Sequence, residues 1–412
     1  MAAPIYLGPE RAGVRWLLDP CSPELARLAR DAHARTPESP CDPDAVAADL
    51  ADLRLLLAQR HFGVATGRIA PSAANQAARL VLAARDRVLR SRPARWGDAL
   101  GDLNDALRLV LRDRHISLQG SRPSAIRVGE SACAVDQSAP AVELREHSGV
   151  LCVVLRRLWG GAEDDRLLWD WADDSVRQFE SDRIIVDLRG NGGGNDGITL
   201  KWVSPVLSAG ATVPGRSAGW YVGETPLGIW NTVAVIEAGQ GASAVPSWHR
   251  EHVRQPTPAD TLSVRDEEED YVARPGARSW AGKMLVLVDG NTRSSGESSA
   301  WVLQHALGGR LIGGRTGGMI EYGNVIPYLL PASGMHVMLP TKHNDFGRPV
   351  ELTGLPVHAD LDPRTPLTAV AAAFDEWYRA ATEGRGVSCQ EPQACAGPAV
   401  CRETSTATTA ME

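Results

Sequence analysis

One stretch in the last third of the chain constrains the fold more than any other, because it combines a buried strand, a tight turn and a helix. Met284–Val288 is an apolar run that ends at Asp289-Gly290, as is typical of a buried strand. Apolar residues then recur at helical spacing from Ala300 to Leu307. Gly308-Gly309 ends this helix, and Leu311-Ile312 begins the next strand. The turn of small residues between the first strand and the helix is the candidate functional element.

This turn contains two serines, Ser294 and Ser295. A hydroxyl at the N-terminus of a helix lies where free N–H groups and the helix dipole favour negative charge, so either serine is a candidate nucleophile. The alternative is an N-cap, whose hydroxyl accepts a hydrogen bond from the first turn of the helix. The turn considered alone favours the N-cap.

Two glycine-rich stretches change this interpretation. Asp187–Gly193 reads D-L-R-G-N-G-G and Ile312–Gly318 reads I-G-G-R-T-G-G. Together with the S-S-G-E turn at Ser294–Glu297, they resemble the D-L-R-x-N-x-G-G, S-A-S-E and V-G-x-x-T-x-G motifs of the C-terminal processing, or tail-specific, serine peptidases, in the same order. The resemblance extends from residue 100 to residue 365. It implies an α/β fold with a crotonase/ClpP-like core, a nucleophilic Ser294, and a peptide or protein substrate.

The general base is predicted by two further positions. Leu111–His115 reads L-R-D-R-H and resembles the L-x-D-x-H pattern of the histidine branch, which includes the tricorn core and interphotoreceptor retinoid-binding protein. An imidazole titrates near neutral pH and can take the serine proton, so His115 is the expected base. The alternative is a helix-terminal histidine that stabilises the dipole. The lysine branch has T-F-G-K, but Met319 stands at its lysine position, and a thioether cannot accept a proton usefully.

The resemblance implies the remaining members of the site. Glu351, in G-R-P-V-E-L-T-G, matches the E-x-x-G element and would orient His115 or balance its positive charge. Gly192 or Gly193 would donate one backbone N–H to the oxyanion, and the amide of Ser295 would donate the other.

No cofactor or metal is predicted. Gly192–Gly197 fits G-x-G-x-x-G, but no acidic residue occurs between Asp196 and Glu224, where a dinucleotide fold places one. His249 and His252 form H-x-x-H without an evident third ligand, and no C-x-x-C occurs, which argues against zinc.

A helical region precedes the core. Apolar residues recur at helical spacing between residues 22 and 118, which predicts helices at Pro23–Ala34, Val46–Arg60, Ala73–Arg90 and Trp96–Arg112. The stretch between Gly120 and the Asp187 strand is too short for the inserted PDZ domain of many bacterial members.

Three regions are therefore predicted. Residues 1–120 form an N-terminal helical region that ends in the candidate base, and residues 121–384 form the α/β catalytic core. Residues 385–412 contain three cysteines but few apolar residues, so we expect this tail to be disordered.

Composition limits the partners and the compartment. A net charge of −7 argues against nucleic acid or an anionic membrane as the main partner. The N-terminus lacks the pattern of a secretory signal, and no stretch approaches 18 apolar residues, so no membrane span is expected. Scattered cysteines favour a reducing cytoplasm. Two alternatives to a peptidase remain at this stage: a non-catalytic binder of an apolar small molecule, and an acyl-transfer or cyclising enzyme.

Overall fold

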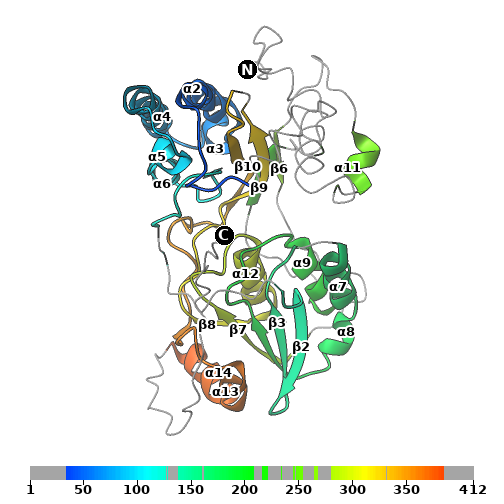
Figure 1. The fold of residues 1–412 in the computed structure, drawn as a ribbon. Helices are drawn as coiled ribbons and strands as arrows, with labels where there is room; N and C mark the ends of the chain where they lie inside the picture. The colour runs from blue at the N-terminus through cyan, green and yellow to red at the C-terminus, as the bar shows by residue number, and fades with distance from the viewer. Residues whose placement is uncertain are drawn as a thin grey trace, which may run out of the picture.

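The computed structural model shows a mixed α/β protein, as predicted, with a helical region ahead of the core (Figure 1). The structure describes residues 34–126, 128, 138–159, 162–207, 216–220, 233, 245, 247–253, 264–267, 280–330 and 332–384. The predicted tail, 385–412, and most of the predicted helix at Pro23–Ala34 lie outside these residues. Among the described helices, none combines the length and the apolar character needed to cross a lipid bilayer.

The larger sheet has the strand order β11-β8-β7-β4-β3-β2. β2 is antiparallel to β3, and the other neighbours are parallel. The strands are β2 (Val142–His147), β3 (Val150–Leu155), β4 (Arg183–Asp187), β7 (Lys283–Val288), β8 (Arg310–Gly313) and β11 (Ala359–Asp360). β4 and β7 both end just before a predicted functional segment. Because they are parallel neighbours, these two segments meet at the same edge of the sheet.

Helices cover both faces of this sheet. Alternate residues of its strands point to opposite faces, and on each face they pack against a different set of helices. Val286 packs in the core on the face beneath α7, α9 and α12, whereas Leu285 packs with Phe374 and Trp377 on the other face. The helices of the first face are α7 (Ala162–Asp173), α8 (Ser175–Gln178), α9 (Gly197–Val203) and α12 (Ser295–Leu307), with a 3₁₀ turn η2 (Ser204–Val206), and those of the second are α13 (Leu367–Ala372) and α14 (Phe374–Glu383).

The smaller sheet lies beside the N-terminal helices at the other end of the molecule (Figure 1). Its path is β1-β10-β5-β6, and β9 also pairs with β10. Its strands are β1 (Ser117–Leu118), β5 (Arg216–Trp220), β6 (Val264–Glu267), β9 (Tyr322–Leu329) and β10 (His336–Asp345). The helices are α2 (Pro43–Arg60), α3 (Phe62–Ala65), α4 (Pro71–Ser91), α5 (Trp96–Leu100) and α6 (Leu103–Leu111), and α11 (Ser247–His252) follows later in the chain.

The helical region and the β9–β10 hairpin share one apolar core. Val337 and Leu339 of β10 pack in the same cluster as Leu50 and Leu107 of α2 and α6. Buried Asp49 also accepts hydrogen bonds from the amides of Ala332 and Ser333, at 2.9 and 2.8 Å, at the hairpin tip. This core therefore crosses the domain boundary predicted at residue 120, and the division of the chain into domains stays a prediction.

One helix prediction was wrong. The segment Trp96–Arg112 forms two helices, α5 and α6, rather than one. Gly101 separates them with a φ of +53°, a left-handed conformation that ends a helix and that glycine adopts readily. Apolar spacing continued across the break, so the periodicity did not reveal it.

Candidate active site

Ser294 lies at the junction of β7 and α12, and its backbone is unusual. It is the N-cap residue of α12, with φ +51° and ψ −125°, a region that residues other than glycine rarely adopt. Such a conformation costs on the order of 1–3 kcal/mol and tends to occur at functional sites. The Ser294 side chain makes no capping hydrogen bond. Its Oγ instead lies 3.1 Å from Nε2 of His115.

His115 comes from the loop between α6 and β1. α6 ends at Leu111, and Arg112 leaves the helix with a left-handed φ of +47°, so the ring of His115 lies beyond the helix end. β1 begins two residues later and pairs with β10, which fixes the backbone on the far side. The ring is buried, and its Nδ1 has no hydrogen-bond partner among the described residues. The nearest acid is Asp113, whose Oδ1 lies 3.6 Å from this nitrogen.

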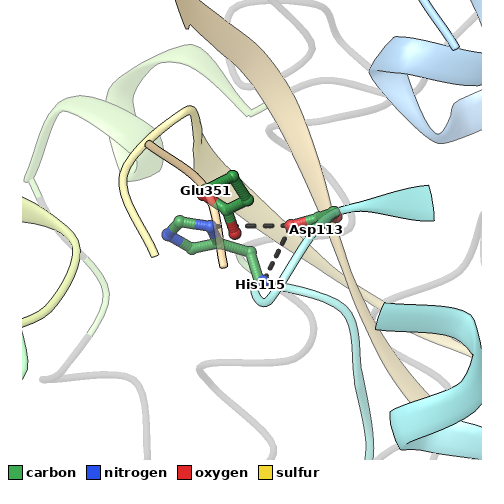
Figure 2. A group of neighbouring side chains, drawn as sticks. All are labelled: Asp113, His115 and Glu351. Atoms are coloured by element: carbon green, nitrogen blue, oxygen red, sulfur yellow. Dashed lines mark hydrogen bonds and ion pairs between the residues drawn. The ribbon is translucent and has the colours of Figure 1, made fainter. Parts of the chain in front are cut away.

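Asp113 is the acid that the sequence analysis did not assign. It is fully buried, and its Oδ1 accepts the backbone N–H of His115 at 2.7 Å (Figure 2). Its Oδ2 lies 3.0 Å from Nε2 of His61. Burial alone would raise the pKa of Asp113, but the hydrogen bonds from the two histidines outweigh it and hold the pKa at about 2. The carboxylate is therefore negatively charged beside the His115 ring.

Glu351 lies next to this pair without a hydrogen bond to the His115 ring (Figure 2). Its carboxylate accepts the backbone N–H of Arg114 at 2.7 Å, and those of Ile320 and Glu321 at 2.9 and 3.0 Å. Burial, and then the charge of Asp113, raise the pKa of Glu351 well above its ordinary value, while the backbone donors oppose the rise. Glu351 thus fixes the peptide unit between Asp113 and His115.

Among the residues that the structure describes, these three side chains also form a group that could hold a metal ion. One ligand atom from each of Asp113, His115 and Glu351 lies within 4.8 Å of the others. Both carboxylates already accept N–H donors, however, and Nε2 of His115 faces Ser294. The donor set does not fit a cation unless several of these hydrogen bonds break, and the prediction of no metal stays a prediction.

The glycine segment after β4 lies against the nucleophile turn. Buried Asn191 accepts the N–H of Arg293 at its backbone oxygen, 2.8 Å away, and the N–H of Gly193 at Oδ1, 2.9 Å away. A Cβ at Gly193 would lie 2.8 Å from Cβ of Ser294, so only glycine fits there. Because the Gly193 amide is already bonded, Gly192 is the better candidate for the oxyanion donor. Neither its amide nor that of Ser295 has an acceptor among the described residues.

Sequence comparison agrees with this geometry. Residues 169–346 match the family model described as peptidase family S41. We call residues 169–346 the S41 segment. The resemblance to the C-terminal processing serine peptidases and the prediction of a serine-type peptidase are confirmed at the level of the family. The S41 segment includes Ser294, Ser295 and both glycines, whereas His115 and Glu351 lie outside it.

Three solved structures illustrate how distant the matches are. A protein proposed to be a peptidase, from Parabacteroides merdae, is 13% identical with a TM-score of 0.40, over 67% of this chain and 82% of that one. The photosystem II D1 C-terminal processing protease is 16% identical with a TM-score of 0.34, over 57% and 53%. The tricorn protease is 13% identical with a TM-score of 0.40, over 82% and 37%. No curated protein matched the chain by sequence.

A further buried acid, which lies within the S41 segment, also shapes the site. Glu297, in the first turn of α12, accepts hydrogen bonds from the hydroxyl of Thr316 at 2.5 Å and from the amides of Gly318 and Met319 at 2.9 and 2.7 Å. The carbonyl of Met319 in turn accepts the N–H of Ser294 at 2.8 Å. Four consecutive amides, from residue 318 to residue 321, are thus held by Glu297 and Glu351.

Lys342 was the remaining alternative to a histidine base. It lies on β10, in register with Gly219 of β5 and Gly323 of β9. The hydrogen-bond partner of the Ser294 hydroxyl is His115. The geometry therefore favours the histidine over the lysine.

Proposed function

We propose that this chain is a serine peptidase in which Ser294 is the nucleophile and His115 the general base. The observation that carries the proposal is the 3.1 Å contact between Ser294 Oγ and His115 Nε2, made by a serine with strained backbone. A serine hydroxyl becomes an effective nucleophile when an adjacent base takes its proton. The neutral ring of His115 presents Nε2 to that proton.

The reaction follows from the positions of the groups. Ser294 Oγ attacks the peptide carbonyl while His115 accepts the hydroxyl proton, and the carbonyl becomes a tetrahedral oxyanion. The amides of Gly192 and Ser295 would donate to this oxygen. The C–N bond of the intermediate then breaks as His115 gives the proton to the leaving amine, which leaves an acyl-enzyme on Ser294. Water, which gives its proton to His115, attacks this ester, and Ser294 regains its proton as it leaves.

Asp113 supports the base directly. Its negative charge, 3.6 Å from Nδ1, would stabilise the imidazolium that forms on His115. Glu351 supports the base indirectly, because it binds the Arg114 amide between Asp113 and His115. This role differs from the direct orientation implied by the family resemblance.

Labelling with a fluorophosphonate probe tests the proposal. The probe reacts with an activated serine, so the intact chain should be labelled at neutral pH and Ser294→Ala should not. Ser295→Ala is the matched control, because its hydroxyl bonds to the carbonyl of Gly194 at 2.7 Å rather than to His115. An intact chain that resists labelling throughout the neutral range would instead favour the non-catalytic binder of an apolar molecule.

The remaining assignments are also proposals. The parallel order of β3, β4, β7 and β8 supports a crotonase-like core. The match of residues 169–346 to a peptidase family model supports a peptide or protein substrate, and the charge of −7 supports a partner other than nucleic acid. Cys41 and Cys152 are free thiols, which supports a reducing compartment such as the cytoplasm.

A further inference from the structure

His61 joins the N-terminal helices to the candidate catalytic centre. It lies between α2 and α3, where it is the C-cap residue of one helix and the N-cap residue of the other. Its side chain is completely buried, and so is that of Asp113, which it contacts at 3.0 Å. Nothing in the motifs that mark the nucleophile or the base includes this residue, and it lies outside the S41 segment.

The hydrogen bonds of His61 define which nitrogen carries its proton. Nδ1 accepts the backbone N–H of Val64 at 3.3 Å, so this nitrogen presents a lone pair. In a neutral imidazole the proton is then on Nε2. His61 therefore donates from Nε2 to Oδ2 of Asp113, and the cap of α3 fixes the tautomer that makes this donation possible.

The two carboxylate oxygens of Asp113 thus accept hydrogen bonds from two separate segments of the chain. Oδ2 accepts His61, while Oδ1 accepts the backbone N–H of His115 and faces the ring of His115. A buried carboxylate with donors on both oxygens has little freedom to rotate. The orientation of Asp113 toward Nδ1 of His115 consequently depends on the contact with His61.

Other titratable groups surround this contact. The ring of Tyr322, from β9, lies 5.5 Å from that of His61, and the ring of His343, from β10, lies 5.0 Å from Tyr322. Burial, then the charge of Asp113, raise the pKa of Tyr322, so this phenol is neutral near pH 7. A carboxylate oxygen of Glu351 lies within 4.8 Å of one of Asp113, and the guanidinium of Arg68 lies 5.7 Å from the Phe62 ring next to His61.

We propose that His61 is a positioning residue for the catalytic base, which acts through Asp113 and makes the N-terminal helices a functional part of the active site. This inference rests on the proposed function. It adds His61 as a fourth residue to the series of contacting residues Ser294, His115 and Asp113. It also explains why a buried histidine lies at a helix junction that apolar side chains could fill.

The test compares His61→Met, which has no donor at the position of Nε2, with His61→Gln, whose amide can donate to Asp113. We expect the rate of fluorophosphonate labelling to fall by about 10- to 100-fold in His61→Met, with most of the rate regained in His61→Gln. In His61→Met, Asp113 loses one donor and attracts the positive charge of His115 more strongly. The pH of half-maximal labelling should therefore rise by roughly 0.5–1 unit, whereas Asp113→Asn should lower it.

Phe62→Leu is the matched control, since Phe62 is a buried neighbour at the same junction. It should retain both the labelling rate and the pH midpoint of the wild type. The inference is overturned if His61→Met labels like the wild type, or if Phe62→Leu with an equal loss of thermal stability loses labelling equally. It also falls if the wild type is not labelled at Ser294, and in that case the proposed function fails first.

Discussion

The hydroxyl of Ser294 lies 3.1 Å from the ring of His115, although 179 positions separate the two residues in the sequence. Each lies in a short segment with a helix or strand on either side. Ser294 follows the buried strand β7 and begins α12, and His115 lies between α6 and β1. This contact therefore joins the edge of the larger sheet to the N-terminal helical region.

The first prediction concerns the base. His115→Ala should reduce labelling nearly as much as Ser294→Ala, because members of a catalytic set act as a unit. Lys342→Ala should label at the wild-type rate. Rates are measured with the same probe at several pH values, and labelling should rise with pH as the base loses its proton. Labelling that survives in His115→Ala and disappears in Lys342→Ala would assign the base to the lysine.

The second prediction separates the two acids near the base. Asp113→Asn keeps the shape of the side chain but removes the charge that stabilises His115, so we expect a loss of about 10²- to 10⁴-fold in labelling rate. Glu351→Gln should cost less, because Glu351 contacts backbone amides rather than the ring. Rates measured at one pH, with circular dichroism to verify folding, distinguish the two. A larger loss in Glu351→Gln would restore the direct role implied by the family resemblance.

The sequence was most informative where local pattern and chemistry coincide. The apolar run before Asp289 predicted β7, and the glycines after Asp187 marked the segment that meets the nucleophile turn. Parallel strands place their carboxyl ends at one edge, so two motifs at strand ends had to approach each other. Three-dimensional adjacency was predictable in this part of the site.

Other members of the site could not be predicted in this way. Asp113 was visible in the L-R-D-R-H pattern, but its role depends on the fold of a short loop that carries no periodic signal. His61 lies at a helix junction, in contact with a residue 52 positions away, and nothing in its neighbourhood suggests chemistry. The same limitation explains the break at Gly101, since apolar spacing reports which face is buried rather than whether the backbone is continuous.

The third prediction concerns stability. Glu297 is buried and binds Thr316 and two backbone amides. Glu297→Ala leaves these buried donors without an acceptor, so the free energy of unfolding should fall by about 3–5 kcal/mol. Glu163, which is exposed on α7, is the control, and Glu163→Ala should change stability by less than about 0.5 kcal/mol. Urea unfolding followed by circular dichroism measures both. Equally small losses of unfolding free energy in Glu297→Ala and Glu163→Ala would show that Glu297 does not stabilise the segment from Thr316 to Met319.

The fourth prediction concerns the approach of the two motifs. A Cβ at Gly193 would lie 2.8 Å from Cβ of Ser294, and the φ of Gly193 is +109°, so Gly193→Ala should displace the nucleophile turn. We expect labelling to fall by at least about 100-fold, since small displacements of reacting groups are costly. Gly323→Ala is the control, because a Cβ there meets nothing within 4 Å. Wild-type labelling of Gly193→Ala would mean that the two segments are further apart than the structure shows.

The last prediction uses the titration of Asp113. Its pKa is about 2 in the folded protein, below the ordinary value of 3.8, so its ionised form is favoured by folding. That stabilisation is complete above about pH 4 and is lost as the pH falls through 2. The difference in unfolding free energy between the wild type and Asp113→Asn should therefore shrink by roughly 2 kcal/mol between pH 5 and pH 2.

Urea unfolding of both proteins at each pH measures this difference, and the other carboxylates cancel because both proteins contain them. Asp44 provides the matched control, since it is exposed and paired with Arg92 in solvent. The difference in unfolding free energy between the wild type and Asp44→Asn should change far less between pH 5 and pH 2, because water screens that pair. A difference for Asp113→Asn that stays constant or grows as the pH falls would mean that Asp113 is not held ionised by His61 and His115.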